Sequence, residues 1–350
     1  MRLLVTGGAG FIGSAIVEHA RGLGYMVRVL DSLRRDVHGP GVEGPAGVEF
    51  VHGDVRDADT VRAALDGIDV VSHQAAKVGL GVDISDAPDY VSSNDWGTAV
   101  LLAGMASSGC ARLVLASSMV VYGEGAYRGA DGPARPAARV IEDLENGEFD
   151  PRDDAGRVLE PTLLDEDAVL DPRNIYAASK LAQEHLASSW ARATNGVVAA
   201  LRYHNVYGPG MPQNTPYAGV ASLFRSAVQR GEAPRVYEDG AQRRDFVHVR
   251  DVASANVAAL LWTDRVARGT FRAFNVGSGE VHTIGELAEH VSRHAVAPVP
   301  VTTGEYRLGD VRHITASSDR IRNEFGWAPA VGFDDGMLEF ATAPLRETVL

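Results

Sequence analysis

A phenol and an ammonium group stand four residues apart in the stretch that contains Tyr176 and Lys180. On a helix, side chains at that spacing share one face. A phenol has an unperturbed pKa of about 10 and is a poor base at neutral pH, but a neighbouring cation favours its ionised form. The pair could therefore accept a proton from a substrate. By itself, this spacing is more often an ordinary solvated contact on a helix surface, so its meaning depends on the rest of the chain.

Glycines recur near the N-terminus, between the apolar run of residues 2–6 and a stretch with helical periodicity. This order predicts a strand, a tight turn and a helix. Gly7, Gly10 and Gly13 would allow the tight turn, the close approach of a pyrophosphate to the backbone, and close packing of the helix on the strand. Phe11 and Ile12 begin the helix, whose N-terminus offers amides to the anion, so we expect both residues at the same dinucleotide site.

A carboxylate, Asp31, ends the second predicted strand, 18 residues after Gly13. At that strand end a carboxylate suits the hydroxyls of an adenosine ribose and would repel a 2′-phosphate. Together with the neighbouring Ser32, it predicts NAD rather than NADP as the cofactor.

Further predicted strands, over residues 48–52, 68–72, 113–116 and 197–203, deliver small or polar side chains where they end. In a parallel sheet the carboxyl ends of the strands line the ligand crevice. Asp54, followed by Val55, could hydrogen-bond an adenine amino group, although a helix cap for the segment from Asp57 is an alternative. The small Ala75 and Ala76 would let a cofactor lie against the backbone. Ser118 reaches the same edge.

Strands that alternate with helices predict a doubly wound parallel α/β sheet of the Rossmann type, with a smaller mixed α/β lobe. We expect helices over residues 86–108, 174–195, 217–230, 249–262 and 335–345. We predict a dinucleotide-binding domain over 1–203, interrupted by an acidic insertion at about 123–171. A substrate lobe would follow over 204–350, from which about 235–276 return to the first domain. The insertion carries 14 acidic and 5 basic side chains and several prolines, which is typical of a solvated cap.

The charge balance of 33 basic and 46 acidic residues argues against binding to nucleic acid or to an anionic membrane. An anionic ligand must then be met by local arginines, and Arg243, Arg244, Arg307 and Arg312 are the candidates. The single cysteine excludes an intramolecular disulfide framework and indicates a reducing compartment. We therefore expect a cytoplasmic protein. Neither the histidines nor the acidic run at 165–167 has ligand-like spacing, so we expect no metal.

Four motifs then stand in one order along the chain: Thr6–Gly13, Ser118 four residues before Tyr122, Tyr176–Lys180, and Arg244–His248. Together they resemble the extended short-chain dehydrogenase/reductase family, which includes nucleotide-sugar epimerases and dehydratases. The resemblance implies a bound NAD, contacts of Ser118 and Tyr176 with the reacting sugar hydroxyl, and a Lys180 that holds the nicotinamide ribose and lowers the pKa of the phenol. Asn94, in the predicted helix 86–108, is included among the expected NAD contacts.

The same resemblance implies a nucleotide diphosphate sugar, with dTDP or UDP, as the substrate. It places Asn205 and Arg244 on the diphosphate, with Arg307 and Asp310 closing over phosphate and ribose. A cap or surface role would explain Asp310 equally well. Family members are commonly dimers through helices such as 86–108 and 174–195, so we expect a homodimer.

The residues after Ser118 favour one reaction. Family members that dehydrate or decarboxylate carry acidic residues just after the catalytic Ser or Thr, whereas Met119 and Val120 stand here and cannot exchange a proton. Epimerisation needs only a base, an oxidant and a ketone that can turn. Tyr176 would take the proton of the C4 hydroxyl while NAD takes and later returns the hydride of the same carbon.

The segment from Val121 to Arg128 and the loop Asn205–Gly210 look like the subgroup of dTDP-L-rhamnose 4-epimerases, which predicts a dTDP-6-deoxyhexose such as dTDP-L-rhamnose or its 6-deoxy-L-talose epimer. Members of that subgroup often carry paired cysteines in the insertion, and this chain has none there. Three alternatives stay open. They are a UDP-hexose 4-epimerase, an NAD(P)H-dependent reductase of a dTDP-4-keto-6-deoxy sugar, and a noncatalytic dinucleotide sensor.

Overall fold

The centre of the protein is a sheet of parallel strands. The computed structural model describes residues 1–39, 42–79, 83–213 and 219–346. Within these, seven strands pair in the order β13-β9-β5-β4-β1-β2-β3. Their bounds are β1 Arg2–Thr6, β2 Met26–Asp31, β3 Glu49–His52, β4 Val70–His73, β5 Arg112–Ser118, β9 Val197–Tyr203 and β13 Phe271–Val276. The chain reverses its direction of travel across the sheet after β3, which places the switch point between β1 and β4.

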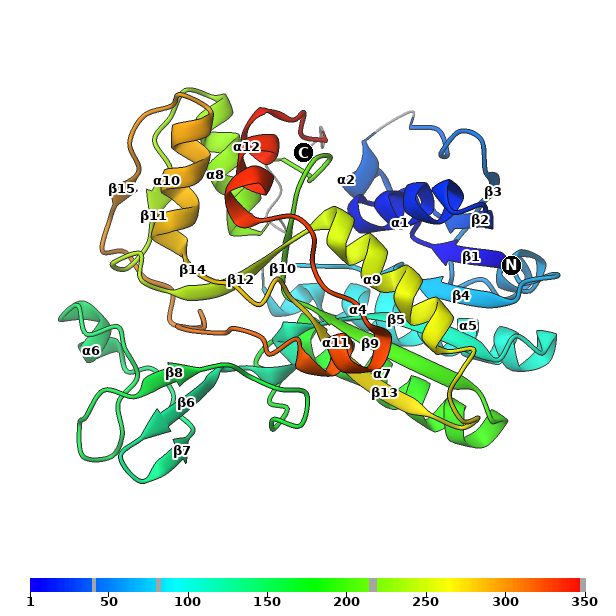
Figure 1. Cartoon of the computed structure of the whole chain (residues 1–350), viewed down its shortest axis with the longest axis horizontal. Helices are drawn as coiled ribbons and strands as arrows, with labels where there is room; N and C mark the ends of the chain where they lie inside the picture. The colour runs from blue at the N-terminus through cyan, green and yellow to red at the C-terminus, as the bar shows by residue number, and fades with distance from the viewer. Residues whose placement is uncertain (40–41, 80–82, 214–218, 347–350) are drawn as a thin grey trace.

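Helices cover both faces of this sheet (Figure 1). Leu3 and Val5 of β1 point to a core that they share with α1 (Phe11–Gly22), α9 (Val249–Trp262) and α11 (Asp319–Phe325). Leu4 points the other way, toward α3 (Ala58–Ala64), α5 (Gly97–Ser108) and α7 (Ile175–Thr194). Side chains that alternate along a strand explain this division. The predicted doubly wound α/β sheet is confirmed.

The predicted helix over 86–108 is present as a continuous helical run in which the type of turn changes along the chain. It consists of the 3₁₀ turn η1 (Ile84–Asp86), α4 (Ala87–Tyr90), a π-helical segment η2 (Val91–Trp96) and α5. A π turn inside a helix often marks a functional position. The predicted helix over 217–230 is α8 (Val220–Gln229), while residues 217 and 218 lie outside the described part of the chain. A short helix that the sequence did not predict, α2 (Arg35–His38), follows β2.

A smaller lobe packs above the carboxyl ends of the strands (Figure 1). Its apolar core joins α8 to α10 (Ile284–His294) and α12 (Phe333–Thr342) through Phe224, Leu287, Met337 and Phe340. One small sheet pairs β10 (Asn205–Tyr207), β12 (Arg243–His248) and β14 (Val281–Thr283), and another pairs β11 (Arg235–Val236) with β15 (Val301–Thr302). From β12 the chain re-enters the main domain as α9 and β13.

The segment from 123 to 171 projects from the body of the protein (Figure 1). It follows the 3₁₀ turn η3 (Met119–Tyr122) and contains β6 (Ala126–Gly129), β7 (Gly132–Ala134), α6 (Ile141–Glu145) and β8 (Glu160–Thr162). Buried charges hold it in place. Arg139 lies 2.7 Å from Glu238 of the lobe, and Asp150 lies 2.7 Å from the buried Arg312.

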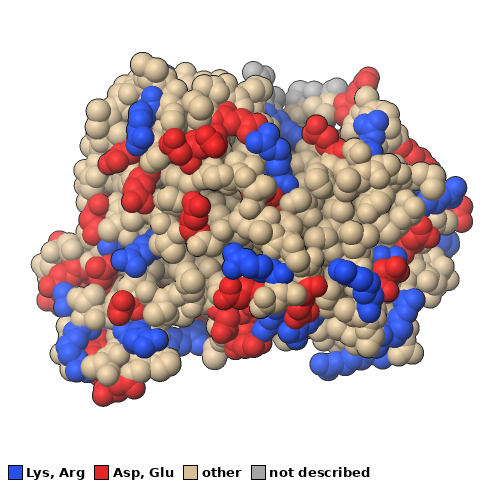
Figure 2. All heavy atoms as spheres, viewed as in Figure 1, with Lys and Arg blue, Asp and Glu red and all other residues tan. Residues whose placement is uncertain are grey.

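Acidic and basic side chains are interspersed on the face that Figure 2 shows. Among the described residues, no helix is long and apolar enough to cross a membrane.

Candidate active site

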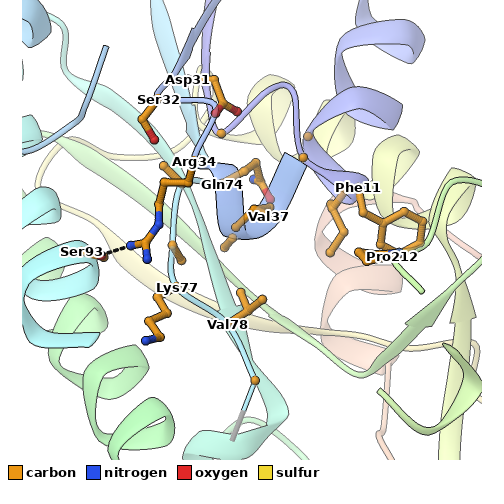
Figure 3. A pocket seen from close by; sticks show the side chains of 18 of the residues that line it. Phe11, Asp31, Ser32, Arg34, Val37, Gln74, Lys77, Val78, Ser93 and Pro212 are labelled. Atoms are coloured by element: carbon orange, nitrogen blue, oxygen red, sulfur yellow. Dashed lines mark hydrogen bonds between the residues drawn. The ribbon is translucent and has the colours of Figure 1, made fainter. Parts of the chain in front are cut away.

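A cavity of about 420 Å³ lies at the carboxyl ends of the central strands. Most of the residues predicted for the cofactor and the catalytic group line it: Gly7, Gly10, Phe11, Ile12, Gly13, Asp31, Ser32, Asp54, Val55, Ala75, Ala76, Ser118, Tyr176 and Lys180. Figure 3 shows Asp31 and Ser32 at one end of this pocket, with Arg34 and Lys77 extending from its wall. The topology explains the gathering, because neighbouring parallel strands end at one edge.

The glycine turn makes the floor of the cavity. Gly7 has a positive φ of 68°, and a Cβ at Gly13 would collide with the carbonyl oxygen of Gly7. Side chains are therefore excluded at both positions. The following helix, α1, begins without a side-chain cap. Its first N–H groups have no intrahelical acceptor and point to the turn. This uncapped helix end beside a glycine cradle fits the pyrophosphate of a dinucleotide.

Asp31 is fixed by the backbone of the same turn. Its Oδ2 accepts the N–H of Ala9 at 3.0 Å, and its Oδ1 accepts the N–H of Leu33 at 2.9 Å. Burial favours the neutral carboxyl, but hydrogen bonds from His38 and from these two N–H groups outweigh it and lower the pKa of Asp31. The carboxylate is thus ionised at neutral pH. Nε2 of His38 lies 3.6 Å from Oδ1 of Asp31. The sequence did not predict this neighbour, because His38 lies on the unpredicted helix α2.

Two arginines at the cavity are already paired with carboxylates of the protein. Arg34 lines the cavity, but its guanidinium binds Asp36 and Asp89 at 2.7 and 3.0 Å and donates to Ser93 (Figure 3). Arg56 holds both carboxylate oxygens of Asp54. Asp54 therefore does not cap α3, whose cap is Asp57. These pairs leave less positive charge for a 2′-phosphate than the presence of two arginines would suggest.

Ser118, Tyr176 and Lys180 meet above the middle of the sheet. Ser118 ends β5, and its Oγ accepts the N–H of Val120 at 3.4 Å. The side chain of Asn174 caps α7 by accepting the N–H of Ala177 at 2.8 Å, which sets the first turn that carries Tyr176. One turn later, the ammonium of Lys180 donates to the carbonyl oxygen of Ala116 at 2.9 Å. The predicted spacing therefore becomes a shared helical face that points into the cavity.

The pKa of Tyr176 is raised, whereas we expected Lys180 to lower it. Burial raises the pKa of Tyr176 to about 12, and the hydrogen bond with Ser118 opposes this only in part. Burial also lowers the pKa of Lys180 to about 8, against the attraction of Glu184 and Asp95. The ammonium is directed to a backbone carbonyl, so it does not offset the burial of Tyr176. In the protein alone, the phenol is the stable form.

Asn94 does not line the cavity. It is fully buried, and it accepts the N–H of Lys77 at 2.8 Å while donating to the carbonyl oxygen of Lys77 and to Ser179. Its amide therefore ties the wall segment at Lys77 to α7. It stands behind the cavity wall, and its predicted contact with the cofactor stays a prediction.

The residues expected to hold the diphosphate also lie outside the lining of this cavity. Arg244 donates to the backbone carbonyls of Arg243, Val311 and Arg312. Arg307 is exposed and lies over the ring of Tyr237. Burial raises the pKa of Asp310, against the charges of Arg307 and Arg244, so these three groups do lie near one another. The side-chain oxygen of Asn205 is buried without a hydrogen-bond partner among the described residues.

One arginine candidate is wrong. Arg312 is almost fully buried and binds Asp150, Glu238 and Asp239, so its charge is consumed inside the protein. Conversely, the cavity is lined by Gln74 and Tyr203, which the sequence analysis did not assign. Both stand at or just after a strand end, and their side chains hydrogen-bond each other at 3.1 Å. Strand-end position was the signal that could have found them.

Comparison with known proteins gives the family. The model of the NAD-dependent epimerase/dehydratase family matches residues 3–277. The chain belongs to that family. It is 35% identical to a dTDP-L-rhamnose 4-epimerase of Burkholderia thailandensis, over 97% of this chain and 94% of that protein. It is 31% identical to a dTDP-glucose 4,6-dehydratase of Streptomyces niveus, over 97% and 91%. Among solved structures, the NAD complex of UDP-glucose 4-epimerase from Thermus thermophilus has a TM-score of 0.73 at 31% identity, covering 97% of this chain and 98% of that one.

These findings confirm the predicted family, the Rossmann fold and an NAD-dependent enzyme of the epimerase type. They favour an enzyme over a noncatalytic sensor, because the chain belongs to an enzyme family and its cavity contains Ser118, Tyr176 and Lys180. The named relatives include both epimerases and a dehydratase, so the reaction has to be argued from the site itself.

Proposed function

We propose that the protein is a nucleotide-sugar 4-epimerase that acts on a dTDP-6-deoxyhexose and interconverts dTDP-L-rhamnose and its 6-deoxy-L-talose epimer. The observation that carries the proposal is the composition of the catalytic edge. Tyr176 and Ser118 lie there together, while the two residues after Ser118 are Met119 and Val120, at the start of η3. Neither side chain can exchange a proton, so Tyr176 carries the acid and base chemistry.

Ser118 and Tyr176 divide the work at the sugar hydroxyl. The Oγ of Ser118 accepts the N–H of Val120, and its hydroxyl hydrogen-bonds Tyr176, so the serine can orient the reacting hydroxyl beside the phenol. Tyr176, as phenolate, would accept the proton of that hydroxyl and later return it. When bound, NAD supplies the acceptor for the C4 hydride and a positive charge that favours the phenolate. Each unit by which the pKa of Tyr176 falls is worth about 1.4 kcal/mol.

Inversion needs no further protein group. After the proton has left the C4 hydroxyl and the hydride has left C4, the sugar is a planar ketone at C4 that can accept a hydride on either face. Turning the ring presents the other face to the same hydride, and Tyr176 gives back the proton it took. Electrons and atoms balance, with no net oxidation of the sugar. Elimination of water would need an additional acid, and Met119 and Val120 do not provide one.

The substrate assignment rests on similarity along nearly the whole chain. The relative from Burkholderia thailandensis, a dTDP-L-rhamnose 4-epimerase, is 35% identical over 97% of the chain. The test is a panel of dTDP and UDP sugars incubated with purified protein, with C4 inversion followed by NMR. We expect conversion of dTDP-L-rhamnose without added NAD(P)H. Faster inversion of UDP-hexoses would reassign the substrate, and a requirement for added NAD(P)H would indicate a reductase.

We further propose that the enzyme is a cytoplasmic homodimer. Trp96 and Val91, at the outer side of the η2 segment next to α7, are 59% and 49% exposed. Exposed apolar side chains that form one patch commonly mark a protein interface, and these two, five residues apart on a π-helical segment, share one face. The single cysteine, Cys110, is free and buried, as suits a reducing compartment. Light scattering gives the molar mass in solution. We expect the mass of a dimer for the wild type and the mass of a monomer for Trp96→Glu.

A further inference from the structure

Two histidines and a carboxylate converge on the surface of the substrate lobe, away from the NAD cavity. His290 and His294 are one turn apart on α10, so their imidazoles share a face. Asp334 comes from the first turn of α12. Its Oδ1 lies 2.9 Å from Nδ1 of His290 and 3.1 Å from Nε2 of His294. One ligand atom from each of the three residues lies within 4.8 Å of the others.

This spacing suits a single ion. Zinc is bound at about 2.0–2.2 Å by imidazole nitrogen and carboxylate oxygen, so two ligands of one tetrahedral ion are about 3.3 Å apart. The observed separations require only small side-chain rotations to reach that arrangement. Both imidazole nitrogens lie near the same carboxylate oxygen, so three donor atoms gather at one place.

The scaffold behind the three residues is rigid. Leu287 and Val291 of α10 pack in the same apolar core as Met337 and Phe340 of α12. The ring of Phe333, directly before Asp334, stands edge-on to His290 with 5.1 Å between centroids. The relative position of the two helices is therefore set by packing and does not depend on a ligand. Such preorganisation is what a binding site needs.

The donors remain accessible and chemically suited to a transition metal. The side chains of His290 and His294 are 21% and 15% exposed, and that of Asp334 is 67% exposed. An ion could therefore enter and keep water as its remaining ligands. Imidazole nitrogen favours Zn²⁺, Cu²⁺, Ni²⁺ and Co²⁺, whereas Mg²⁺ and Ca²⁺ prefer oxygen donors alone.

We propose that His290, His294 and Asp334 bind a divalent transition-metal ion such as Zn²⁺, which ties α10 to α12 in the substrate lobe. This departs from the expectation of no metal. The sequence concealed the site because Asp334 lies 40 residues beyond His294, on another helix. The ion is distinct from the catalytic group and would stabilise the lobe, since an ion that binds only the folded state shifts the folding equilibrium.

The test uses the full-length protein, treated with a chelator and dialysed. Calorimetric titration with Zn²⁺ should give one ion per chain, and titration with Co²⁺ should produce visible absorption bands of a protein-bound ion. Zn²⁺ should also raise the Tm. His290→Ala and Asp334→Asn should each weaken Zn²⁺ binding at least about tenfold and abolish the rise in Tm.

Matched controls come from the same surface. Asp335→Asn removes the adjacent exposed carboxylate on α12, and His282→Gln removes the imidazole stacked on Phe333. Both controls should bind Zn²⁺ as the wild type does. The proposal is overturned if the wild type shows no saturable binding of Zn²⁺ or Co²⁺. It is equally overturned if His290→Ala and Asp334→Asn bind Zn²⁺ as tightly as the wild type, because the ion then lies elsewhere.

Discussion

The NAD cavity and the smaller lobe differ in how they hold the charged side chains that we expect to meet a ligand. In the cavity, Asp31 is held by backbone N–H groups and keeps its charge turned to the space where a ligand fits. In the lobe, the guanidinium of Arg244 is bound to three backbone carbonyls and that of Arg312 to three carboxylates. The cavity thus presents a fixed carboxylate to its ligand, whereas the guanidinium groups of Arg244 and Arg312 are already bound by the protein.

The difference indicates which region has to rearrange when its ligand binds. NAD can enter a cavity whose polar groups are already placed, at little cost in reorganisation. A nucleotide diphosphate that uses Arg244 has to replace carbonyl partners contributed by residues 311 and 312. We infer that the lobe rearranges around the sugar nucleotide while the cavity does not.

The largest effect should come from Tyr176→Phe in the cavity. Removing the phenol oxygen removes the proton carrier, so kcat should fall by about 10²–10⁴-fold, the range typical of general acid–base catalysis. The helix and the glycine turn are unchanged, so bound NAD should remain, as absorbance and mass spectrometry of the purified variant would show. A variant with near wild-type kcat would contradict the assignment of Tyr176.

A second test compares a buried arginine of the central sheet with a buried arginine of the lobe. Arg202 of β9 forms a bidentate pair with Glu184, and both side chains are almost fully buried. Arg202→Met would leave that carboxylate unpaired and should lower the free energy of unfolding by about 3–5 kcal/mol. Arg312→Met should lower it by about 1–3 kcal/mol, because Asp150 and Asp239 are about half exposed. Chemical denaturation measures both. Equal losses in the free energy of unfolding would mean that the buried ion pairs of the lobe contribute as much to stability as that of the sheet.

Asp31→Ala should alter cofactor choice more modestly. Loss of a charged acceptor at the adenosine ribose should weaken NAD by about 1.5–3 kcal/mol, and the preference for NAD over NADP should shrink accordingly. Titration of the cofactor-free protein with both dinucleotides measures this. Asp59→Asn, an exposed carboxylate on α3, is the control and should change neither affinity. Unchanged affinities in Asp31→Ala would show that the discrimination lies elsewhere.

The smallest effect is expected at Arg307. This exposed side chain lies over Tyr237, so Arg307→Ala should raise the KM for the nucleotide sugar by about fivefold, equivalent to about 1 kcal/mol, and leave kcat unchanged. Arg244→Ala should raise KM more, since its guanidinium is half-buried and held in place by three backbone carbonyls. Arg235→Ala, which removes an exposed partner of Glu305, should have no effect. If neither Arg307→Ala nor Arg244→Ala moves KM, the diphosphate is held elsewhere.

The same contrast explains what the sequence could predict. Parallel strands end at the same edge of a sheet. The hydrophobic periodicity that predicts the strands was therefore enough to place Asp31, Ala75 and Ser118 in one cavity. Partners in the lobe come from distant loops. Nothing local says that Arg312 meets Asp150, or that Asp334 meets His294. The pKa of Tyr176 was also beyond reach, because it depends on burial and on where the ammonium of Lys180 points.

The central claim is that Tyr176 moves only the hydroxyl proton while the hydrogen on C4 is carried away and returned as hydride. Epimerisation of dTDP-L-rhamnose in D₂O, followed by NMR, tests it directly. The account predicts C4-inverted product that retains its original carbon-bound hydrogen at every position. Deuterium on a ring carbon, or a product that has lost water, would contradict it.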